Sequence, residues 1–177
     1  MVPISGRLIS GAGKMTEVQI RNAEERDREA VWQIIKSVLA GGDTYVFPPD
    51  SPRAAMIEYW FDPHKHVYVA EAQGSVLGTF WLKENQPGLG SHIANAAYMV
   101  SPSATGKGIG RAMAEFSIDE ARLLGFKAMQ FNFVVKSNEP AVKLWQSVGF
   151  QIIGEIPDAF DHSTNGLTNA YIMYRKL

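Results

Sequence analysis

Hydrophobic residues recur at helical spacing in three long segments of the chain, and a shorter helix is expected from Arg53 to Trp60. The first long segment ends at the glycine pair 41–42, the second at Gly125 and the third at Gly149, and glycine commonly terminates helices. The third begins beside Pro140, which a first helical turn tolerates. The predicted apolar faces are Val31, Ile34, Ile35 and Val38; Ile109, Met113, Phe116 and Leu124; and Ala141, Leu144, Trp145 and Val148.

Strand-like segments alternate with these helices, which predicts an α/β fold. Two of the segments are separated only by Gln73 and Gly74 and should form a hairpin, and a polar loop with His162 and Gly166 is expected between the last two. No repeat or linker divides the chain, so one domain is predicted. The predicted strands are Glu17 to Arg21, His66 to Ala72, Ser75 to Leu82, Ala94 to Val100, Ala128 to Val135, Phe150 to Ile156 and Ala170 to Arg175.

Two segments lie outside these elements. Gly41 to Pro52 is rich in turn formers but contains Tyr45 and Phe47, so we expect either a packed surface loop or a loop that carries aromatic side chains over a site. Residues 1–15 combine glycines with polar residues and end at a second methionine, which is typical of a leader that is disordered or was added for expression. The domain is therefore expected to span residues 16–177.

Composition narrows the classes of function. The 177 residues are 46% hydrophobic and 20% charged, which is ordinary for a globular domain. Cysteine is absent, which excludes disulfides, cysteine nucleophiles and thiolate metal sites and is consistent with a cytoplasmic setting. The net charge of −1 gives no overall attraction to nucleic acid or to a membrane surface, although a local basic groove would not show in this sum.

Glycines are concentrated between the strand that ends at Val100 and the helix that follows. Gly106, Gly108 and Gly110 let the backbone approach a ligand closely, and free N–H groups at a helix start attract negative charge. The pattern predicts a diphosphate site. It is not a P-loop, which needs Ser or Thr after Gly-Lys, nor a dinucleotide fingerprint, which needs a third glycine where Arg111 stands.

This segment and a second motif together resemble the GNAT superfamily of N-acetyltransferases. The first motif is Val100, Pro102 and Thr105-Gly-Lys-Gly-Ile-Gly110, and the second is Ser137-Asn-Glu-Pro-Ala141 with Leu144-Trp-Gln-Ser-Val-Gly-Phe150. The resemblance implies a central mixed, mostly antiparallel sheet of about six to seven strands, flanked by about four helices and splayed between the fourth and fifth strands. The opening would lie between the strands that end near Val100 and Val135. Acetyl-CoA is the implied cosubstrate, and no metal is expected.

The resemblance also assigns residues to acetyl-CoA. It implies that Met99 and Val100 pair with the pantetheine arm, that the backbone from Gly106 to Arg111 holds the pyrophosphate, and that Asn138 flanks the thioester. The implied set is Met99, Val100, Thr105, Gly106, Lys107, Gly108, Ile109, Gly110, Arg111, Asn138, Lys143 and Trp145. Thr105 departs from the usual Gln or Arg, and Trp145 replaces a tyrosine that often protonates the leaving thiolate, a role that an indole N–H cannot take.

Polar residues on the strands beside the opening are candidates for the acceptor site. Asn95, Tyr98, Asn132 and Asn138 resemble the pattern of fungal GNAT enzymes that acetylate proline-like imino acids, which implies that Asn95 and Asn132 bind the acceptor. An alternative for Asn132 is a buried structural amide with its own partners. The predicted catalytic residues are Asn132, Asn138 and Tyr98, and the predicted substrate-binding residues are Asn95, Asn132, Tyr45 and Phe47.

The proton acceptor is not evident. No Asp or Glu lies between His92 and Val100, where a carboxylate base is usual for this family. A water or a base from elsewhere could replace it, and His162 has a suitable intrinsic pKa, although a lone loop histidine is more often a surface residue. His64 and His66 have no third ligand and predict no metal site.

The sequence therefore predicts an enzyme that moves an acetyl group from acetyl-CoA to a small-molecule amine, such as an amino acid or imino acid. Direct attack in a ternary complex is expected because no cysteine can form an acyl-enzyme. Two alternatives stay open: a noncatalytic acyl-CoA sensor, and acetylation of a peptide or protein amine. No nucleic-acid or membrane partner is expected, and a homodimer is one of the assemblies left open.

Overall fold

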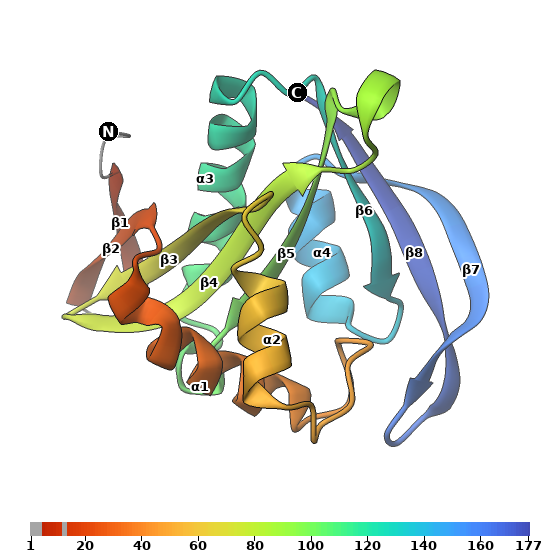
Figure 1. Cartoon of the computed structure of the whole chain (residues 1–177), viewed down its shortest axis with the longest axis horizontal. Helices are drawn as coiled ribbons and strands as arrows, with labels where there is room; N and C mark the ends of the chain where they lie inside the picture. Colours follow the sequence, from red (N-terminus) through yellow and green to blue (C-terminus); the bar gives the residue numbers. More distant parts are fainter. Residues whose placement is uncertain (1–4, 12–13) are drawn as a thin grey trace.

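The computed structural model describes residues 5–11 and 14–177, which form a twisted sheet with helices on both faces (Figure 1). Within these residues the sheet has eight strands in the order β1-β2-β3-β4-β5-β6-β8-β7. The strands are β1 (Ser5–Gly11), β2 (Lys14–Asn22), β3 (His66–Ala72), β4 (Ser75–Glu84), β5 (Ile93–Val100), β6 (Ala128–Val135), β7 (Gln151–His162) and β8 (Gly166–Lys176). The helices are α1 (Arg28–Leu39), α2 (Arg53–Trp60), α3 (Ile109–Leu123) and α4 (Glu139–Ser147), with short 3₁₀ turns at Glu25–Asp27, Gly88–Gly90 and Pro102–Ala104.

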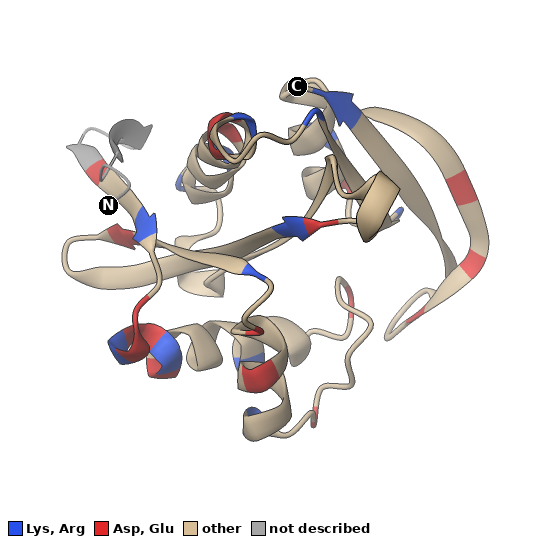
Figure 2. Cartoon of the chain, turned by 45° about the horizontal axis from the view of Figure 1, so that its top comes forward, with Lys and Arg blue, Asp and Glu red and all other residues tan. Residues whose placement is uncertain are grey.

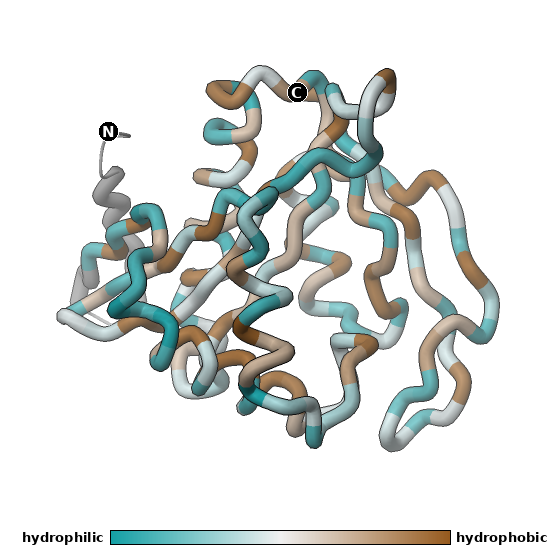
Figure 3. Tube along the Cα trace, in the orientation of Figure 1, coloured by the Kyte–Doolittle hydropathy of each residue, from teal (hydrophilic) through white to brown (hydrophobic). Residues whose placement is uncertain are grey.

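Different helix pairs cover the two faces of the sheet. Figure 3 shows hydrophobic and polar residues alternating along the elements, as expected where each buries one side. On one face, α1 and α2 pack Ile35 and Trp60 against Trp81 of β4 and Met99 of β5. On the other face, α3 and α4 cover a larger core whose buried residues include Tyr68, Phe80, Leu82, Ile109, Met113, Phe131 and Trp145.

The sheet opens between its two parallel neighbours. β5 and β6 pair only at Ile93 with Ala128 and at Ala94 with Met129, and the remainder of the two strands diverges, whereas all other neighbouring strands are antiparallel. This confirms the predicted mixed, mostly antiparallel fold and its opening, because β5 and β6 are the fourth and fifth of the strands that the sequence predicted. A gap between strands exposes backbone groups that must find other partners.

The last two strands are longer than predicted. The polar loop expected around His162 is part of the β7–β8 hairpin, whose strands reach His162 and start again at Gly166. Register shifts between Ile152 and Gly154 and between Ile156 and Phe160 break the alternation of side chains along β7. The pattern on which strand prediction depends is therefore interrupted there.

Two further predictions need correction or qualification. Leu124 was placed on the apolar face of the helix after the glycine-rich segment, but it is the exposed C-cap of α3, and Ile118 and Ala121 are buried instead. Part of the expected leader forms β1, which pairs with β2 at the edge of the sheet, while residues 1–4 and 12–13 lie outside the described residues. The boundary at residue 16 stays a prediction. In the described part of the chain, no helix is long and apolar enough to cross a membrane.

Candidate functional site

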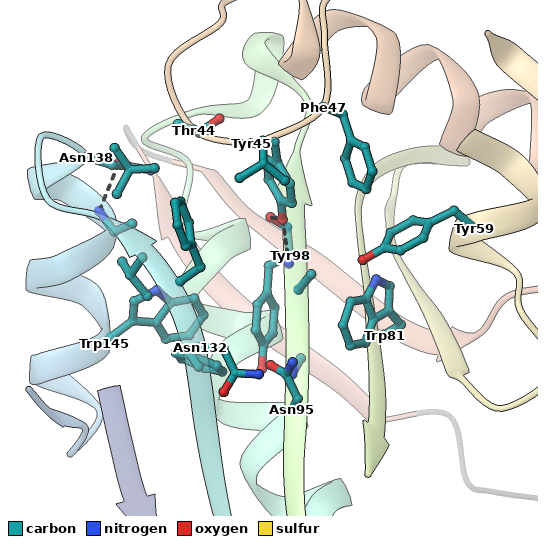
Figure 4. Close-up of a pocket in the computed structure, with 18 residues that line it drawn as sticks. Thr44, Tyr45, Phe47, Tyr59, Trp81, Asn95, Tyr98, Asn132, Asn138 and Trp145 are labelled. Carbon is teal, nitrogen blue, oxygen red and sulfur yellow. Dashed lines mark hydrogen bonds between the residues drawn. The ribbon is translucent and has the colours of Figure 1, made fainter. Parts of the chain in front are cut away.

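A pocket of about 240 Å³ occupies the opening between β5 and β6 (Figure 4). It passes through the sheet, because its lining includes Trp81 from the α1–α2 side and Trp145 from the α3–α4 side. The loop after α1 closes one side with Tyr45 and Phe47. The remaining lining residues come mainly from β5, β6 and α4 and include Asn95, Ala96, Ala97, Tyr98, Phe131, Asn132, Phe133 and Asn138.

Along the open edge of β5, backbone groups of Ala96 and Tyr98 form hydrogen bonds with side chains instead of with a neighbouring strand. The N–H of Ala96 donates to Oδ1 of Asn95 at 2.8 Å. The N–H of Tyr98 donates to the Tyr45 hydroxyl at 3.0 Å, and the same hydroxyl donates to the Tyr98 carbonyl at 2.7 Å. An extended ligand with amide groups could pair with this edge in the manner of an added strand. The edge is thus suited to a pantetheine arm, which carries two amides.

The side chain of Tyr98 points away from this edge. Its hydroxyl lies 2.7 Å from Oγ of Ser117 in α3, and its ring stacks on Phe80 at 5.3 Å between centroids. Burial raises the pKa of the Tyr98 phenol. The geometry therefore favours the backbone of Tyr98, rather than its phenol, for contact with a ligand.

Asn95 and Asn132 line the same pocket from opposite sides of the opening (Figure 4). Asn132 is exposed rather than buried, which corrects the premise of the structural alternative. Its Nδ2 donates to Oδ1 of Asn85 at 2.7 Å, and its Oδ1 accepts from Gln130 Nε2 at 2.9 Å. A register shift between Phe131 and Val134 removes Asn132 from the ladder with β8, so its side chain is free to face the opening.

Asn85 and Gln130 were not predicted. Gln130 could have been found, because residues two apart on a strand share a face. Asn85 lies just after β4, 47 residues from Asn132, and no local pattern connects the two. Together they fix the orientation of the Asn132 amide.

The glycine-rich turn leads into the start of α3. Gly106 and Gly108 have φ angles of +77° and +79°, a conformation that favours glycine. No side chain caps α3 and no acidic residue occupies its first turn, so the first N–H groups remain free for an anion. In contrast, α4 is capped by Oδ1 of Asn138, which accepts from Ala141 N at 3.3 Å. The observed start of α3 therefore fits a pyrophosphate, as expected for acetyl-CoA.

Other predicted CoA residues have partners in the structure. Arg111 donates to Oγ of Ser147 at 3.0 Å, and Nζ of Lys143 lies 2.8 Å from Glu139. Thr105 and Lys107 are exposed in the turn, Met99 is buried against α1 and α2, and Val100 packs against the larger core. Trp145 is buried, with its ring 4.7 Å from those of Tyr98 and Phe131, and also lines the pocket.

His162 does not reach the pocket. Its Nδ1 accepts the N–H groups of Thr164 and Asn165 at 3.1 and 3.3 Å, which stabilises the turn between β7 and β8. The next residue, Ser163, bonds the carbonyls of Gly42 and Gly41, each at 3.1 Å, and so connects this turn to the loop that carries Tyr45.

Charged side chains are absent from the described residues that line the pocket. Figure 2 shows charges along the helices and near the ends of β4 and β8. Burial raises the pKa of the Tyr45 and Tyr59 phenols, so both remain neutral near pH 7. Among the described residues, no group of three or more His, Cys, Asp or Glu could hold a metal ion.

An α/β sheet that opens between parallel strands, next to an uncapped glycine-rich helix start, defines a class of acyl-CoA-binding fold. Residues 28–150 match the family model for the acetyltransferase (GNAT) family. The chain therefore belongs to the GNAT family, whose members are acetyl-CoA-dependent acyltransferases.

Individual relatives agree with this assignment. A GCN5-related N-acetyltransferase from Kribbella flavida superimposes with a TM-score of 0.87 at 40% identity, covering 90% of this chain and 98% of that one. N-acetyltransferase aca1 of Schizosaccharomyces pombe is 41% identical over 99 residues, which are 55% of this chain and 47% of aca1. The chain thus matches about half the length of that relative.

A third similarity concerns the fold alone. The structure of yncA, a putative acetyltransferase from Salmonella typhimurium with its cofactor acetyl-CoA, has a TM-score of 0.80 at 22% identity and covers 90% of this chain and 94% of that chain. This fold therefore accommodates acetyl-CoA in a solved structure.

Proposed function

We propose that the protein transfers the acetyl group of acetyl-CoA to the amine of a small amino acid or imino acid. One observation carries the proposal: a single small pocket joins the open edge of β5 to Asn95 and Asn132. A thioester held on that edge would therefore lie next to an amine held by the two amides. This proximity is the main requirement for direct transfer.

The residues have distinct proposed roles. The N–H of Tyr98 donates a hydrogen bond to the acyl oxygen once the Tyr45 hydroxyl moves aside, and the start of α3 holds the pyrophosphate. Asn95 and Asn132 orient the acceptor. Since the described lining contains no carboxylate, imidazole or ammonium group, the amine proton leaves to water.

The size of the pocket supports a small acceptor. Its volume of about 240 Å³ is below the roughly 300–1,000 Å³ of typical ligand pockets. Tyr45 and Phe47 add bulky aromatic side chains to the lining, which leaves little room for a peptide. We therefore favour a free amino or imino acid over a protein amine.

The proposal can be tested with a panel of acceptors. Amino acids, cyclic imino acids, polyamines and short peptides are incubated with acetyl-CoA, while release of free CoA thiol is measured and products are identified by mass spectrometry. We expect turnover with amino or imino acids. Turnover only with peptides would contradict the acceptor class, and acetyl-CoA binding without turnover by any amine would favour a noncatalytic sensor.

A further inference from the structure

One polar atom beside the acceptor side of the pocket has no partner. Nε1 of Trp81 is buried, with 3% of the residue exposed, and it has no hydrogen-bond partner among the described residues. Trp81 lines the pocket, and Figure 4 shows its indole nitrogen on the side where the Tyr59 hydroxyl lies. The adjacent Trp60 is also buried, but its N–H donates to Oγ1 of Thr79 at 3.0 Å. Since buried donors are nearly always paired, the Trp81 N–H indicates a place for a ligand oxygen.

Two ammonium groups lie close to the same aromatic rings. Nζ of Lys65 is 3.4 Å from the centroid of the Tyr59 ring and 4.7 Å from that of Trp81. Nζ of Lys83 is 5.9 Å from the Trp81 ring centroid, and Lys83 stands opposite Asn95 in the β4–β5 ladder. A cation over an indole face draws electron density from the ring and makes its N–H a better donor to an anion.

Among the described residues around these aromatic rings, acidic side chains lie on the outer side, away from the pocket between β5 and β6. Asp62 and Glu84 share an outer cavity with the two lysines, and Asp62 is engaged with Nδ1 of His64 at 3.1 Å. The lining of the pocket between β5 and β6 includes no described Asp or Glu. An anionic group inside that pocket would therefore face neutral donors and, through one layer of aromatic rings, the two ammonium groups.

We infer that the indole N–H of Trp81 is a specificity-determining donor to the carboxylate of the acceptor, with Lys65 and Lys83 supplying positive potential from behind the ring. The inference rests on the proposed acetyl transfer to amino or imino acids and assigns a residue to their recognition. Trp81 belongs to the α1–α2 face, where Asn95 and Tyr59 also lie, and not to the α3–α4 face that receives CoA. An acceptor oxygen is therefore a better partner for it than the acyl oxygen.

The experiment compares a cyclic imino acid with its neutral carboxamide, which differs only in the anionic group. Trp81→Phe removes the N–H and keeps an aromatic ring. We expect kcat/KM for the imino acid to fall about tenfold to a hundredfold, mainly through its KM, as for loss of a hydrogen bond to a charged group. The KM of acetyl-CoA and the kcat/KM of the carboxamide should change less than about threefold.

The chain offers matched controls. Trp60→Phe makes the same change in a neighbouring buried tryptophan that does not line the pocket, so it should lower the melting temperature without changing the preference for the acid. Lys65→Gln should lower kcat/KM for the imino acid several-fold. Lys65→Arg should restore this value, because the positive charge acts through the aromatic ring. Lys65→Gln also keeps the inference testable if Trp81→Phe does not fold.

Binding is measured beside turnover, by calorimetry of the imino acid and the carboxamide on the CoA complex. Two results would overturn the inference while acetyl transfer stands. One is that Trp81→Phe lowers the affinity and kcat/KM equally for the imino acid and the carboxamide. The other is that the wild-type protein does not prefer the imino acid over the carboxamide. Preferential binding of the acid that depends on Trp81, without turnover by any amine, would support the carboxylate site and contradict the proposed function.

Discussion

The hydroxyl of Tyr45 bridges the backbone of Tyr98, accepting from its N–H at 3.0 Å and donating to its carbonyl at 2.7 Å. The two residues are 53 positions apart, and the bridge connects the loop after α1 to the open edge of β5. An acyl-CoA that pairs with this edge must replace the phenol there. Binding of cosubstrate and movement of the loop are therefore expected to be coupled.

Tyr45→Phe should destabilise the ligand-free protein and strengthen acetyl-CoA binding. Without the hydroxyl, a partly buried donor and acceptor of Tyr98 lose their partner, at a cost of about 1–3 kcal/mol, or roughly 2–12 °C in melting temperature. Acetyl-CoA restores these bonds without competition, so its Kd should decrease by up to about tenfold. Thermal melts with and without acetyl-CoA, with Tyr59→Phe as a control in the same pocket, measure both effects. Weaker acetyl-CoA binding in Tyr45→Phe would show that the hydroxyl belongs to the complex.

Gly108→Asp should abolish stabilisation by CoA. Gly108 is the left-handed residue at the start of α3, where a carboxylate would oppose the pyrophosphate. At a hundredfold excess over its Kd, CoA should stabilise the wild-type protein by about 2.7 kcal/mol, or roughly 5–11 °C. Gly108→Asn is the matched control, since asparagine tolerates this backbone conformation and carries no charge. If both variants respond to CoA like the wild type, the turn is not the pyrophosphate site.

Local patterns were sufficient for most of the fold. The bounds predicted for α2, β3 and β6 agree with the structure, and turn formers or glycine flank each of these segments. The end of β7 was predicted too early, at Ile156 rather than His162, because the register shifts displace side chains from one face of the strand to the other. Such irregularities depend on the partner strand and leave little trace in the sequence.

The site was only partly predictable for the same reason. The glycine-rich turn is a local motif, and Gly106 and Gly108 have the backbone conformation expected of it. Tyr45 was predicted to lie near a site, but its bond to Tyr98 depends on how the loop packs. The unpaired N–H of Trp81 could not be predicted, because a tryptophan in a strand ordinarily indicates only a buried position.

Asn132→Ala should lower acceptor use without a large loss of stability. Asn132 is exposed, so the free energy of unfolding should change by less than about 0.5 kcal/mol. If its amide binds the acceptor, kcat/KM should fall about tenfold to a hundredfold, with the Kd of CoA unchanged. Asn95→Ala should have a similar effect, and the double variant should lose less than the sum, since both groups would hold one ligand.

Asn85→Ala provides the control for this prediction. Asn85 does not line the pocket but bonds Nδ2 of Asn132, so its removal should raise the acceptor KM by a smaller factor, about threefold to tenfold. Normal turnover by Asn132→Ala together with a much lower melting temperature would instead identify Asn132 as a structural residue.

The preference for an acidic acceptor should decrease above about pH 8. Burial, and to a smaller extent repulsion from Lys83, lowers the pKa of Lys65 to about 8, while Asp62 opposes the shift. A lysine is charged below its pKa and neutral above it, so the share of the positive potential behind Trp81 that Lys65 supplies is present at pH 7 and lost as the pH rises through 8. The ratio of kcat/KM for an imino acid to that for its carboxamide should therefore fall between about pH 7 and pH 9. Taking the ratio at each pH, with the amine pKa of each acceptor measured separately, corrects for ionisation of the amine itself. In Lys65→Gln the corrected ratio of kcat/KM values should be lower at pH 7 and should not change with pH. If the ratio still depends on pH in this variant, another group is responsible for the titration.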